Sequence, residues 1–430
     1  MTVFKPFRRV WLYAICAGLA FLPGCGGVSS SSPQIIPGTP IADCAIKQIN
    51  ALKPPCPPGV SCATLSNGNW NDSAFQTVLS SSAVFGVNIY VPWNTVETSQ
   101  QVYDFSDLDA QIGAYQGTNK KVNLMWMAIN YGYINDSAGG VNNMTPSYVF
   151  TTSWATTAGA GASSPQDVVY CSTYPGNRTF VNTNANILTP NFDSTGYPAV
   201  YEKPFTAAYQ NFIQKVIQHY NGNSAIGYMR FGLSVGDEAD AYCTAQLQSI
   251  PSPNTFSPDP SPMVWQTYVQ AMDLFEHNQN PTVQLMESLN SLDTTSDPTV
   301  MPIIEAQNAV QYGFGFGSNG WQNSDIAALA SNTPCTADWC ALFDQYAGQV
   351  PLELQTSQPS DPVDPVGPSN TTGNLATLIP TAAEHHATIL EIALPDLYLG
   401  LVPGYQPANP NDASYASAYQ AAITDPCSSN

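Results

Sequence analysis

Short apolar runs alternate along this chain with segments whose apolar residues recur every three to four positions. The first pattern is typical of buried β-strands and the second of amphipathic helices. Their alternating order predicts an α/β fold with a parallel sheet. The predicted strands are residues 84–92, 121–129, 231–238, 282–289, 309–316, 350–356 and 387–394, and the predicted helices are residues 71–82, 104–115, 204–220, 263–277, 302–307, 339–346 and 375–385.

One more strand, which we expect within residues 35–65, would complete a set of eight. Eight strand–helix units form a (β/α)₈ barrel of ~250 residues, so the chain is long enough for one barrel with long loops. We predict this barrel over residues 43–430. The polar stretches 130–203 and 248–262 are interpreted as walls of a cleft at the C-terminal face, and not as separate domains.

Two apolar strand-like segments carry carboxylates at places where a barrel carries its active site. Residues 228–243 read YMRFGLSVGDEADAYC and include Asp237 and Glu238, whereas residues 350–356 read VPLELQT around Glu353. Catalytic groups of such barrels lie at the C-terminal ends of the strands. Three strand–helix units of about 35–40 residues would fill the segment between Glu238 and Glu353. Glu238 and Glu353 are therefore predicted on strands four and seven.

A pair of carboxyl groups about 5–5.5 Å apart can hydrolyse a glycosidic bond with retention of configuration. We assign Glu238 as the acid/base and Glu353 as the nucleophile, and Asp237 would orient Glu238 or bind a substrate hydroxyl. Glu391 and Glu287 also lie in apolar strands, so each is an alternative nucleophile or a residue that tunes the acid/base. An acidic pair at the start of a helix is the structural alternative for Asp237 and Glu238.

Aromatic and amide side chains lie near the predicted C-terminal ends of the strands. Aromatic rings stack on the flat C–H faces of sugars, and amides bind sugar hydroxyls. Each aromatic residue taken singly fits core packing equally well, but the group predicts a substrate-lining role. The predicted lining residues are Trp93, Asn94, Trp126, Asn130, Tyr131, Trp321, Gln355, Glu391 and Tyr398.

Other chemistry has little support in the sequence. The four histidines show no metal-ligand spacing, and there is no phosphate-binding loop, dinucleotide fingerprint or G-x-S-x-G elbow. We therefore expect no metal and no cofactor.

Charge is sparse and mainly negative, with 11 basic against 31 acidic residues. This balance argues against nucleic acids and anionic membrane surfaces as partners, since both attract basic patches. Charged residues make up only 10% of the chain. We interpret this as adaptation to an acidic habitat, because a surface with few carboxylates changes little in charge when the pH falls. Compositional drift among secreted proteins is the alternative.

The N-terminus has the features of an export signal. A basic segment precedes the apolar residues 10–22, which are too few to cross a bilayer. The following Leu-Pro-Gly-Cys sequence resembles a bacterial lipobox, which implies a lipid anchor on Cys25; ordinary signal cleavage is the alternative. Residues 1–25 are the predicted signal peptide and residues 26–42 a flexible tether. The chain is expected at the cell envelope or secreted.

Cysteine usage suggests disulfide bonds. Apart from Cys16 and Cys25, eight of the 10 cysteines remain, and an even number in an exported chain suggests up to four disulfides. Sequence alone allows 105 pairings of eight cysteines. Short separations favour Cys56–Cys62 and Cys335–Cys340, and the remaining cysteines suggest Cys171–Cys243 and Cys44–Cys427. Some of these thiols are free and buried in the alternative interpretation.

Several segments resemble the clan of retaining glycoside hydrolases that carry their acid/base and nucleophile on strands four and seven. Residues 86–97 (GVNIYVPWNTVE) and 102–109 (VYDFSDLD) are similar to a pattern of the β-galactosidase-like barrels. Residues 145–149 (TPSYV) resemble the T-P-x-W-V sequence that follows strand three in those barrels. Residues 232–238 occupy the place of a strand-four segment ending in Asn-Glu, and residues 353–355 (ELQ) resemble the E-L-D of strand seven in related xylanases.

The resemblance covers most of residues 71–397 and implies retaining hydrolysis of β-linked oligo- or polysaccharides. It implies Glu238 as the acid/base and Glu353 as the nucleophile. Asp237 replaces an asparagine that bonds the 2-hydroxyl of the sugar in the clan, and an aspartate can accept that bond but cannot donate it. The alternatives are a carbohydrate-binding surface lipoprotein on a decayed barrel, an inverting hydrolase or lyase, and a structural envelope protein. We expect a monomer.

Overall fold

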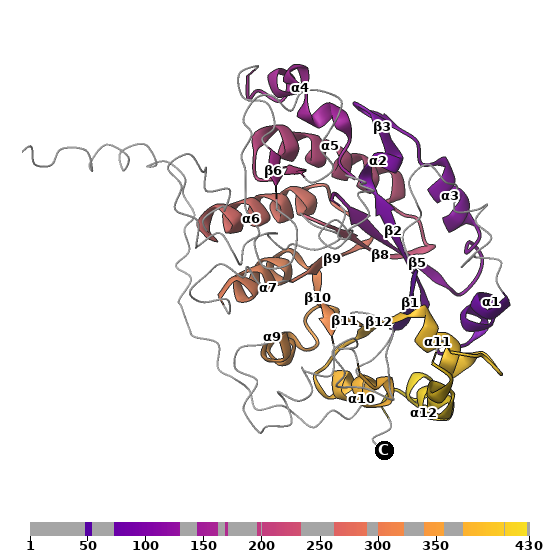
Figure 1. Ribbon diagram of the computed structural model, residues 1–430. Coiled ribbons are helices and arrows are strands. Elements are labelled where there is room, and N and C mark those ends of the chain that lie inside the picture. The colour runs from indigo at the N-terminus through magenta and orange to yellow at the C-terminus, as the bar shows by residue number, and fades with distance from the viewer. Residues whose placement is uncertain are drawn as a thin grey trace, which may run out of the picture. The chain divides into compact units, whose positions relative to one another are not determined.

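A closed barrel of eight parallel strands forms the centre of the fold (Figure 1). The computed structural model describes residues 48–53, 73–129, 144–161, 168–170, 196–198, 200–233, 262–289, 300–321, 339–356, 373–407 and 409–427. The strands follow the order β1-β12-β11-β10-β9-β8-β5-β2, and β1 closes the barrel because it pairs with both β12 and β2. They are β1 (Gln48–Lys53), β2 (Gly86–Pro92), β5 (Lys121–Met127), β8 (Ile226–Phe231), β9 (Gln284–Ser288), β10 (Gly315–Trp321), β11 (Leu352–Thr356) and β12 (Ile389–Ala393). The predicted (β/α)₈ barrel is confirmed.

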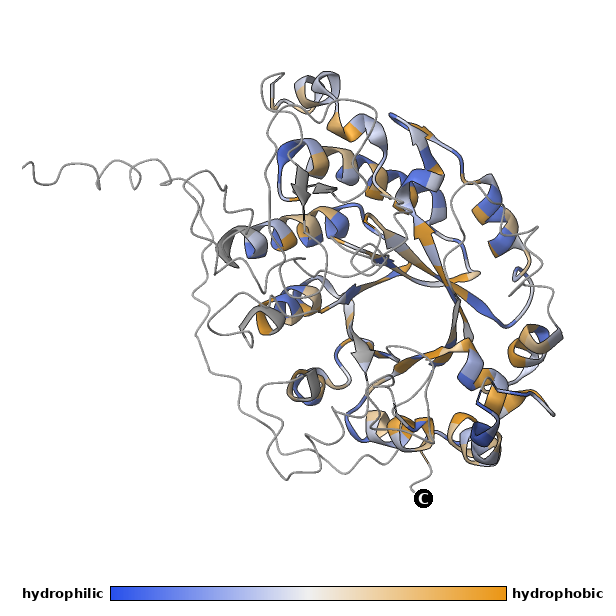
Figure 2. Cartoon of the chain, viewed as in Figure 1, coloured by the Kyte–Doolittle hydropathy of each residue, from blue (hydrophilic) through white to orange (hydrophobic). Residues whose placement is uncertain are grey.

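Helices surround the barrel, and apolar and polar residues share each of them (Figure 2). The longer helices are α1 (Ser73–Ser80), α3 (Ser106–Gly113), α5 (Lys203–Tyr220), α6 (Pro262–Asn278), α7 (Val300–Tyr312), α9 (Trp339–Tyr346), α10 (Leu375–Glu384), α11 (Leu394–Leu401) and α12 (Ala416–Thr424). Within the part of the chain that the structure describes, no helix has the length and hydropathy needed to cross a membrane.

The loops carry smaller elements. They are α2 (Trp93–Val96), η2 (Ser147–Phe150), α4 (Thr152–Thr157), η4 (Pro410–Tyr415), and two antiparallel pairs, β3 (Glu97–Ser99) with β4 (Val102–Tyr103) and β6 (Val168–Tyr170) with β7 (Gly196–Pro198). The stretch 130–203, predicted as a loop, therefore contains η2, α4 and the β6–β7 pair.

Helix α5 shows how the pattern of the sequence becomes packing. Its apolar residues recur at helical spacing, and a proline lies in its first turn, where the missing N–H removes no helical hydrogen bond. The buried face includes Phe205, Tyr209, Phe212, Val216 and Tyr220. This aromatic face packs against Trp93 of α2 and Trp126 of β5.

Two predicted strand positions are wrong. Strand four was expected at residues 231–238 but is β8, which ends at Phe231, and residues 234–238 lie outside the described part of the chain. Strand six was expected at residues 309–316, where helix α7 in fact continues to Tyr312 before β10 begins at Gly315.

Gly313 is the reason for the second difference. Its φ of 75° places it in the left-handed region, which favours glycine. Its N–H donates to Val310 at 3.1 Å and the N–H of Phe314 donates to Ala309 at 2.8 Å, the pattern that ends a helix with a left-handed residue. The apolar sequence AVQYGFGF therefore joins the end of a helix to the start of a strand.

The barrel strands separate two environments. Outward residues of β11 and β12, such as Leu354 and Leu390, belong to the large core between strands and helices. Inward residues such as Met286 and Ile389 belong to a separate small cluster inside the barrel. Because side chains alternate along a strand, Glu353 and Glu391 face the interior.

Candidate active site

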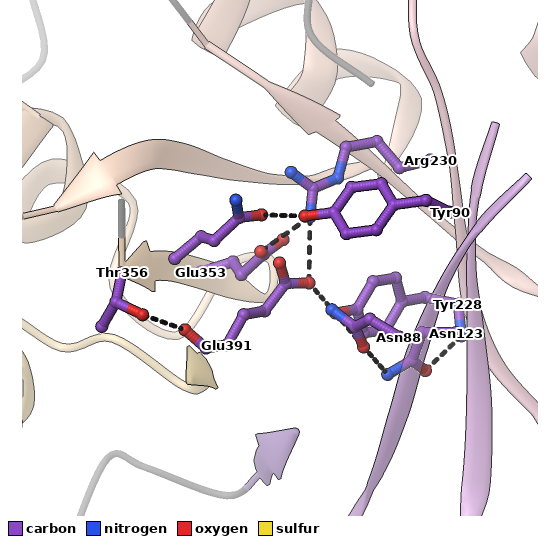
Figure 3. A network of polar contacts seen from close by, with 9 residues as sticks. Asn88, Tyr90, Asn123, Tyr228, Arg230, Glu353, Thr356 and Glu391 are labelled. Carbon is purple, nitrogen blue, oxygen red and sulfur yellow. Dashed lines mark hydrogen bonds and ion pairs between the residues drawn. The ribbon is translucent and has the colours of Figure 1, made fainter. Parts of the chain in front are cut away.

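A buried ion-pair network joins three barrel strands (Figure 3). Arg230 of β8 binds Glu353 of β11 and Glu391 of β12 through the same nitrogen, Nη2, with distances to the two Oε1 atoms of 2.7 and 2.9 Å. Arg230 and Glu391 are fully buried, and Glu353 is 1% exposed. Buried charges are costly unless they are paired, so the positive charge of Arg230 is what allows two carboxylates inside the barrel.

Tyr228, two residues before Arg230, extends this network. Its hydroxyl donates to Glu391 Oε1 and accepts from Asn88 Nδ2 at 3.2 Å. Asn123 Nδ2 donates to Asn88 Oδ1 at 2.7 Å, and Asn123 Oδ1 accepts from the Tyr228 N–H at 3.2 Å. Burial, followed by the charges of Glu391 and Glu353, raises the pKa of Tyr228 well above its usual value. Tyr228 therefore stays protonated and remains a donor to Glu391.

Tyr90 and Gln355 form the partly exposed end of the network. The Tyr90 hydroxyl donates to Gln355 Oε1 at 3.2 Å, and both side chains are half-buried. Gln355 pairs with Glu391 in the register of β11 and β12. Two residues after Glu353, it faces the same interior. The polar interior thus extends from fully buried ion pairs to side chains that water can reach.

Gly317 leaves space for Glu353 on the neighbouring strand. The two residues are register partners in β10 and β11. A Cβ atom at position 317 would lie 2.8 Å from Glu353 Cβ and 3.2 Å from its Oε2. The absence of a side chain at this position is therefore a condition for the observed place of the Glu353 carboxylate.

The structure brings together three of the predicted site residues, namely Glu353, Gln355 and Glu391. Asp237, Glu238, Asn130 and Tyr131 lie outside the described residues, as do Cys25 and the cysteines at positions 44, 56, 62, 171, 243 and 335. The side chain of Cys340 is likewise not described. Cys427 is disulfide-bonded.

Trp93 and Trp126 do not line a cleft. Both are fully buried, and both pack on Phe212 of helix α5, with ring centroids 5.4 and 5.3 Å apart. Their rings are covered by the helix, so the two residues serve core packing, which corrects the predicted substrate-lining role. Trp321 is 2% exposed at the end of β10 and also belongs to the core.

Two further predicted lining residues lie in short helices. Asn94 is half-buried in α2, and its backbone N–H donates to Met144 at 2.9 Å. Tyr398 is half-buried in α11 and packs against Tyr405 with ring centroids 5.4 Å apart.

Glu287 does not join the ion-pair network. It follows the inward-facing Met286 on β9, so it points to the outside of the barrel. The acidic groups that act on it are Asp273, Glu305 and Glu276, which come from helices α6 and α7. This placement argues against Glu287 as the nucleophile.

Sequence reasoning missed Arg230, Tyr228, Tyr90, Asn88 and Asn123. A signal was present, because a buried parallel strand is normally continuously apolar and these polar residues interrupt it. In β8 the polar positions are two residues apart, and in β2 Asn88 and Tyr90 are two residues apart. Polar residues at a spacing of two indicate a polar barrel interior.

A second buried carboxylate connects the segments 86–97 and 145–149. Glu97 is fully buried and accepts from Trp93 Nε1 at 2.7 Å and from the Tyr148 hydroxyl at 2.8 Å. The N–H of Gln101 also donates to it, at 2.8 Å. Burial raises the pKa of Glu97 and these hydrogen bonds oppose the rise. Glu97 therefore joins the segment that follows β2, which contains Trp93, to helix η2, which contains Tyr148.

Among the described residues, no group of three or more His, Cys, Asp or Glu side chains is arranged to hold a metal ion. Arg230 stands where a cation would otherwise be needed to compensate Glu353 and Glu391.

No protein-family model matches the sequence, and no curated protein matches it. Similar solved structures include the lactosyl-enzyme intermediate of endo-glycoceramidase II from Rhodococcus sp., with a TM-score of 0.41, 13% identity, and coverage of 81% of this chain and 73% of that chain. Its ganglioside GM3 complex gives a TM-score of 0.39, 14% identity, and coverage of 81% and 74%. Similarity of this extent does not identify a function.

Proposed function

We propose that the chain is a glycoside hydrolase that cleaves β-linked oligo- or polysaccharides with retention of configuration. The observation that carries the proposal is the carboxylate of Glu353, which lies inside a (β/α)₈ barrel and is bound by Arg230 at 2.7 Å. Catalytic groups of such barrels come from several different strands. Strand β8 supplies Arg230, and Glu238 follows the same strand in the sequence.

In this proposal Glu353 attacks the anomeric carbon and Glu238 gives a proton to the leaving glycosidic oxygen. The bond from the anomeric carbon to that oxygen breaks as the ester to Glu353 forms. Glu238 then takes a proton from water, whose oxygen attacks the anomeric carbon and releases Glu353. Attack requires an ionised carboxylate, and the charge of Arg230 favours that form of Glu353.

Glu391 fits a supporting role better than the role of nucleophile. Its Oε1 atom accepts from both Arg230 and Tyr228, so Tyr228 and Arg230 together fix this carboxylate, and Glu353 Oε1 accepts from the same Arg230 nitrogen (Figure 3). Through Arg230, the charge of Glu391 holds the guanidinium beside Glu353. We therefore assign Glu353 as the nucleophile and Glu391 as a residue that positions Arg230.

Trapping of the covalent intermediate tests this assignment. The full chain would be assayed from pH 3 to 7 with aryl β-glycosides and plant polysaccharides, and then incubated with an activated 2-deoxy-2-fluoro β-glycoside. We expect mass spectrometry to find the sugar on the peptide that contains Glu353. A label on Glu391 would reverse the assignment, and turnover with inversion of configuration would contradict the retaining mechanism.

Variants supply the second arm of this test. Glu353→Gln and Glu238→Gln should each abolish turnover of unactivated substrates, whereas Glu384→Gln, at an exposed position of α10, should leave turnover unchanged. Full activity in Glu353→Gln would overturn the assigned nucleophile. Each variant would first be shown to fold by its urea unfolding curve.

Carbohydrate binding without hydrolysis is the second candidate function. The burial of the ion pairs favours this function, because a buried carboxylate that is already paired is available to stabilise the barrel without attacking a substrate. Arg230, Glu353 and Glu391 compensate one another without any ligand, as a purely structural network would. Measurable binding of oligosaccharides by calorimetry, without turnover of any glycoside, would select this candidate.

We also propose that the chain is exported and carries a lipid on Cys25. The support is the order of basic segment, apolar segment and Leu-Pro-Gly-Cys sequence. The mass of the mature N-terminal peptide would test it, because lipid on Cys25 and an unmodified N-terminus differ in mass. A Cys25→Ser variant that stays in the membrane fraction would contradict the anchor.

A further inference from the structure

Four acidic side chains meet on the outer side of the barrel, away from the candidate active site. Glu287 comes from strand β9, Asp273 and Glu276 come from helix α6, and Glu305 comes from helix α7. Helices α6 and α7 pack on each other beside this strand. The exposed fractions of Asp273, Glu276, Glu287 and Glu305 are 2%, 5%, 5% and 1%. We refer to these four residues as the acidic quartet.

Three members of the quartet, Asp273, Glu276 and Glu287, have little to compensate a negative charge. Among the described residues, Glu287 Oε1, Glu287 Oε2 and Asp273 Oδ2 have no hydrogen-bond partner. No described lysine or arginine forms an ion pair with Asp273, Glu276 or Glu287. Arg230 is in register with Met286 but faces the barrel interior, where it binds the two active-site carboxylates.

The titratable groups that neighbour the quartet on the packed helices are tyrosines and one histidine. On α6, the Tyr268 hydroxyl donates to Leu233 at 2.7 Å, and Tyr209 of α5 acts on it electrostatically. At the end of α6, His277 packs against Tyr312 of α7 with ring centroids 5.1 Å apart. Thus His277 is the basic group among these neighbours, and no described lysine or arginine forms an ion pair with Asp273, Glu276 or Glu287.

A buried carboxyl without a partner takes its neutral, protonated form. Burial raises the pKa of Glu287 well above its usual value, and the charges of Asp273, Glu305 and Glu276 raise it further. Burial also raises the pKa of Asp273, and burial together with Asp273 raises the pKa of Glu276.

We propose that the acidic quartet is a proton-binding element that makes this barrel more stable in acid than at neutral pH. The ligand of this element is the proton. The carboxyl groups that bind it lie between strand β9 and the two helices, α6 and α7, that flank this strand. The proposal is independent of the proposed function, because the active-site carboxylates lie on the opposite side of the strands.

The direction of the pH dependence follows from proton linkage. The unfolded chain releases the protons of Asp273, Glu276 and Glu287 near the ordinary carboxyl pKa of about 4, whereas the folded chain keeps them to a higher pH. The stabilisation is fully present below that ordinary pKa and is lost as the pH rises through the raised folded pKa. In that interval each retained proton increases the unfolding equilibrium constant about tenfold per pH unit.

Urea unfolding of the full chain, followed by tryptophan fluorescence at pH 4, 5, 6 and 7, tests the proposal. We expect the unfolding equilibrium constant of the parent to increase as the pH rises. Glu287→Gln and Asp273→Asn keep the shape of the side chain but bind no proton. Each should therefore lower, by up to about one, the slope of the logarithm of the unfolding equilibrium constant against pH. The control Glu384→Gln should keep the parent slope.

Three results would overturn the proposal. The first is a parent that is as stable at pH 7 as at pH 4, and the second is an unchanged slope in both quartet variants. The third is stabilisation at pH 7 by added Ca²⁺, reversed by a chelator and absent in Glu287→Gln, which would make the quartet a cation site. If the variants do not fold, infrared spectra of the parent decide, because protonated carboxyl bands should persist at pH 6.

Discussion

At the scale of single residues, Arg230 has the largest consequences for this barrel. Its guanidinium compensates two carboxylates from different strands, and it is fully buried itself. Pairing of this kind contributes little net stability compared with an apolar core, but removal of one partner leaves an uncompensated buried charge. The side chain therefore determines whether Glu353 and Glu391 can stay inside.

We predict that Arg230→Met lowers the free energy of unfolding by about 3–5 kcal/mol, because methionine fills space without compensating Glu353 and Glu391. Urea unfolding at pH 7 measures the loss. The triple variant with Glu353→Gln and Glu391→Gln should recover part of it, since the buried charges are then absent. A loss below ~1 kcal/mol in Arg230→Met would contradict the charge-compensating role.

At the scale of elements, strand β10 depends on a glycine, because no side chain fits on one face of it. Its residue Gly317 lies beside Glu353 of β11, with no room for a Cβ atom on that face. Helix α3 contains a glycine in a different environment, because a Cβ atom at Gly113 would meet nothing within 4 Å. Substitution of each glycine by alanine therefore distinguishes the effect of close packing, at Gly317, from the effect of backbone entropy, at Gly113.

We predict that Gly317→Ala lowers the free energy of unfolding by about 1–3 kcal/mol, because the added methyl group is forced against Glu353. It should also lower any glycosidase activity, since Glu353 must shift. Gly113→Ala is the matched control and should raise the free energy of unfolding by about 0.4–1 kcal/mol. Equal effects of the two substitutions on urea unfolding would rule out a specific contact at Gly317.

Elements also show where sequence interpretation succeeds. Helix 204–220 was predicted within one residue of α5, because a long helix with a regular apolar spacing has few alternatives. The strand predicted at residues 309–316 was wrong, because a short apolar run fits the end of a helix as well as a strand. Only the left-handed conformation of Gly313 decides between them.

At the scale of the whole molecule, the two ends of the described chain meet at the closure of the barrel. Strand β1 pairs with β12, and the following helix α11 packs against α1 and α12. Tyr419 of α12 is fully buried and accepts the backbone N–H of Leu375 through its hydroxyl at 3.3 Å. Beyond α12, Cys427 is disulfide-bonded.

We predict that Cys427→Ser lowers the free energy of unfolding by about 2–4 kcal/mol, because the disulfide restricts the unfolded chain. Parallel urea curves of the parent and the variant, both without reductant, measure this difference. A thiol titration of the unfolded variant should show one newly free cysteine. Identical urea midpoints would show that this disulfide does not stabilise the barrel.

The order of strands and helices, and with it the barrel, could be predicted from the sequence. Apolar periodicity is a local property, and strands that alternate with helices have few ways to pack. Glu353 and Glu391 were recognised for a similar reason, since a charge within an apolar strand is conspicuous in any sequence.

Only the tertiary structure decided which polar groups meet. Arg230 and Glu353 are far apart in sequence, and the closed barrel places their side chains 2.7 Å apart. The same holds for Trp93 and Trp126, whose burial depends on the position of helix α5, and for the acidic quartet, which exists only where α6 and α7 flank β9. Contacts between distant segments depend on register and barrel closure, and no local pattern carries that information.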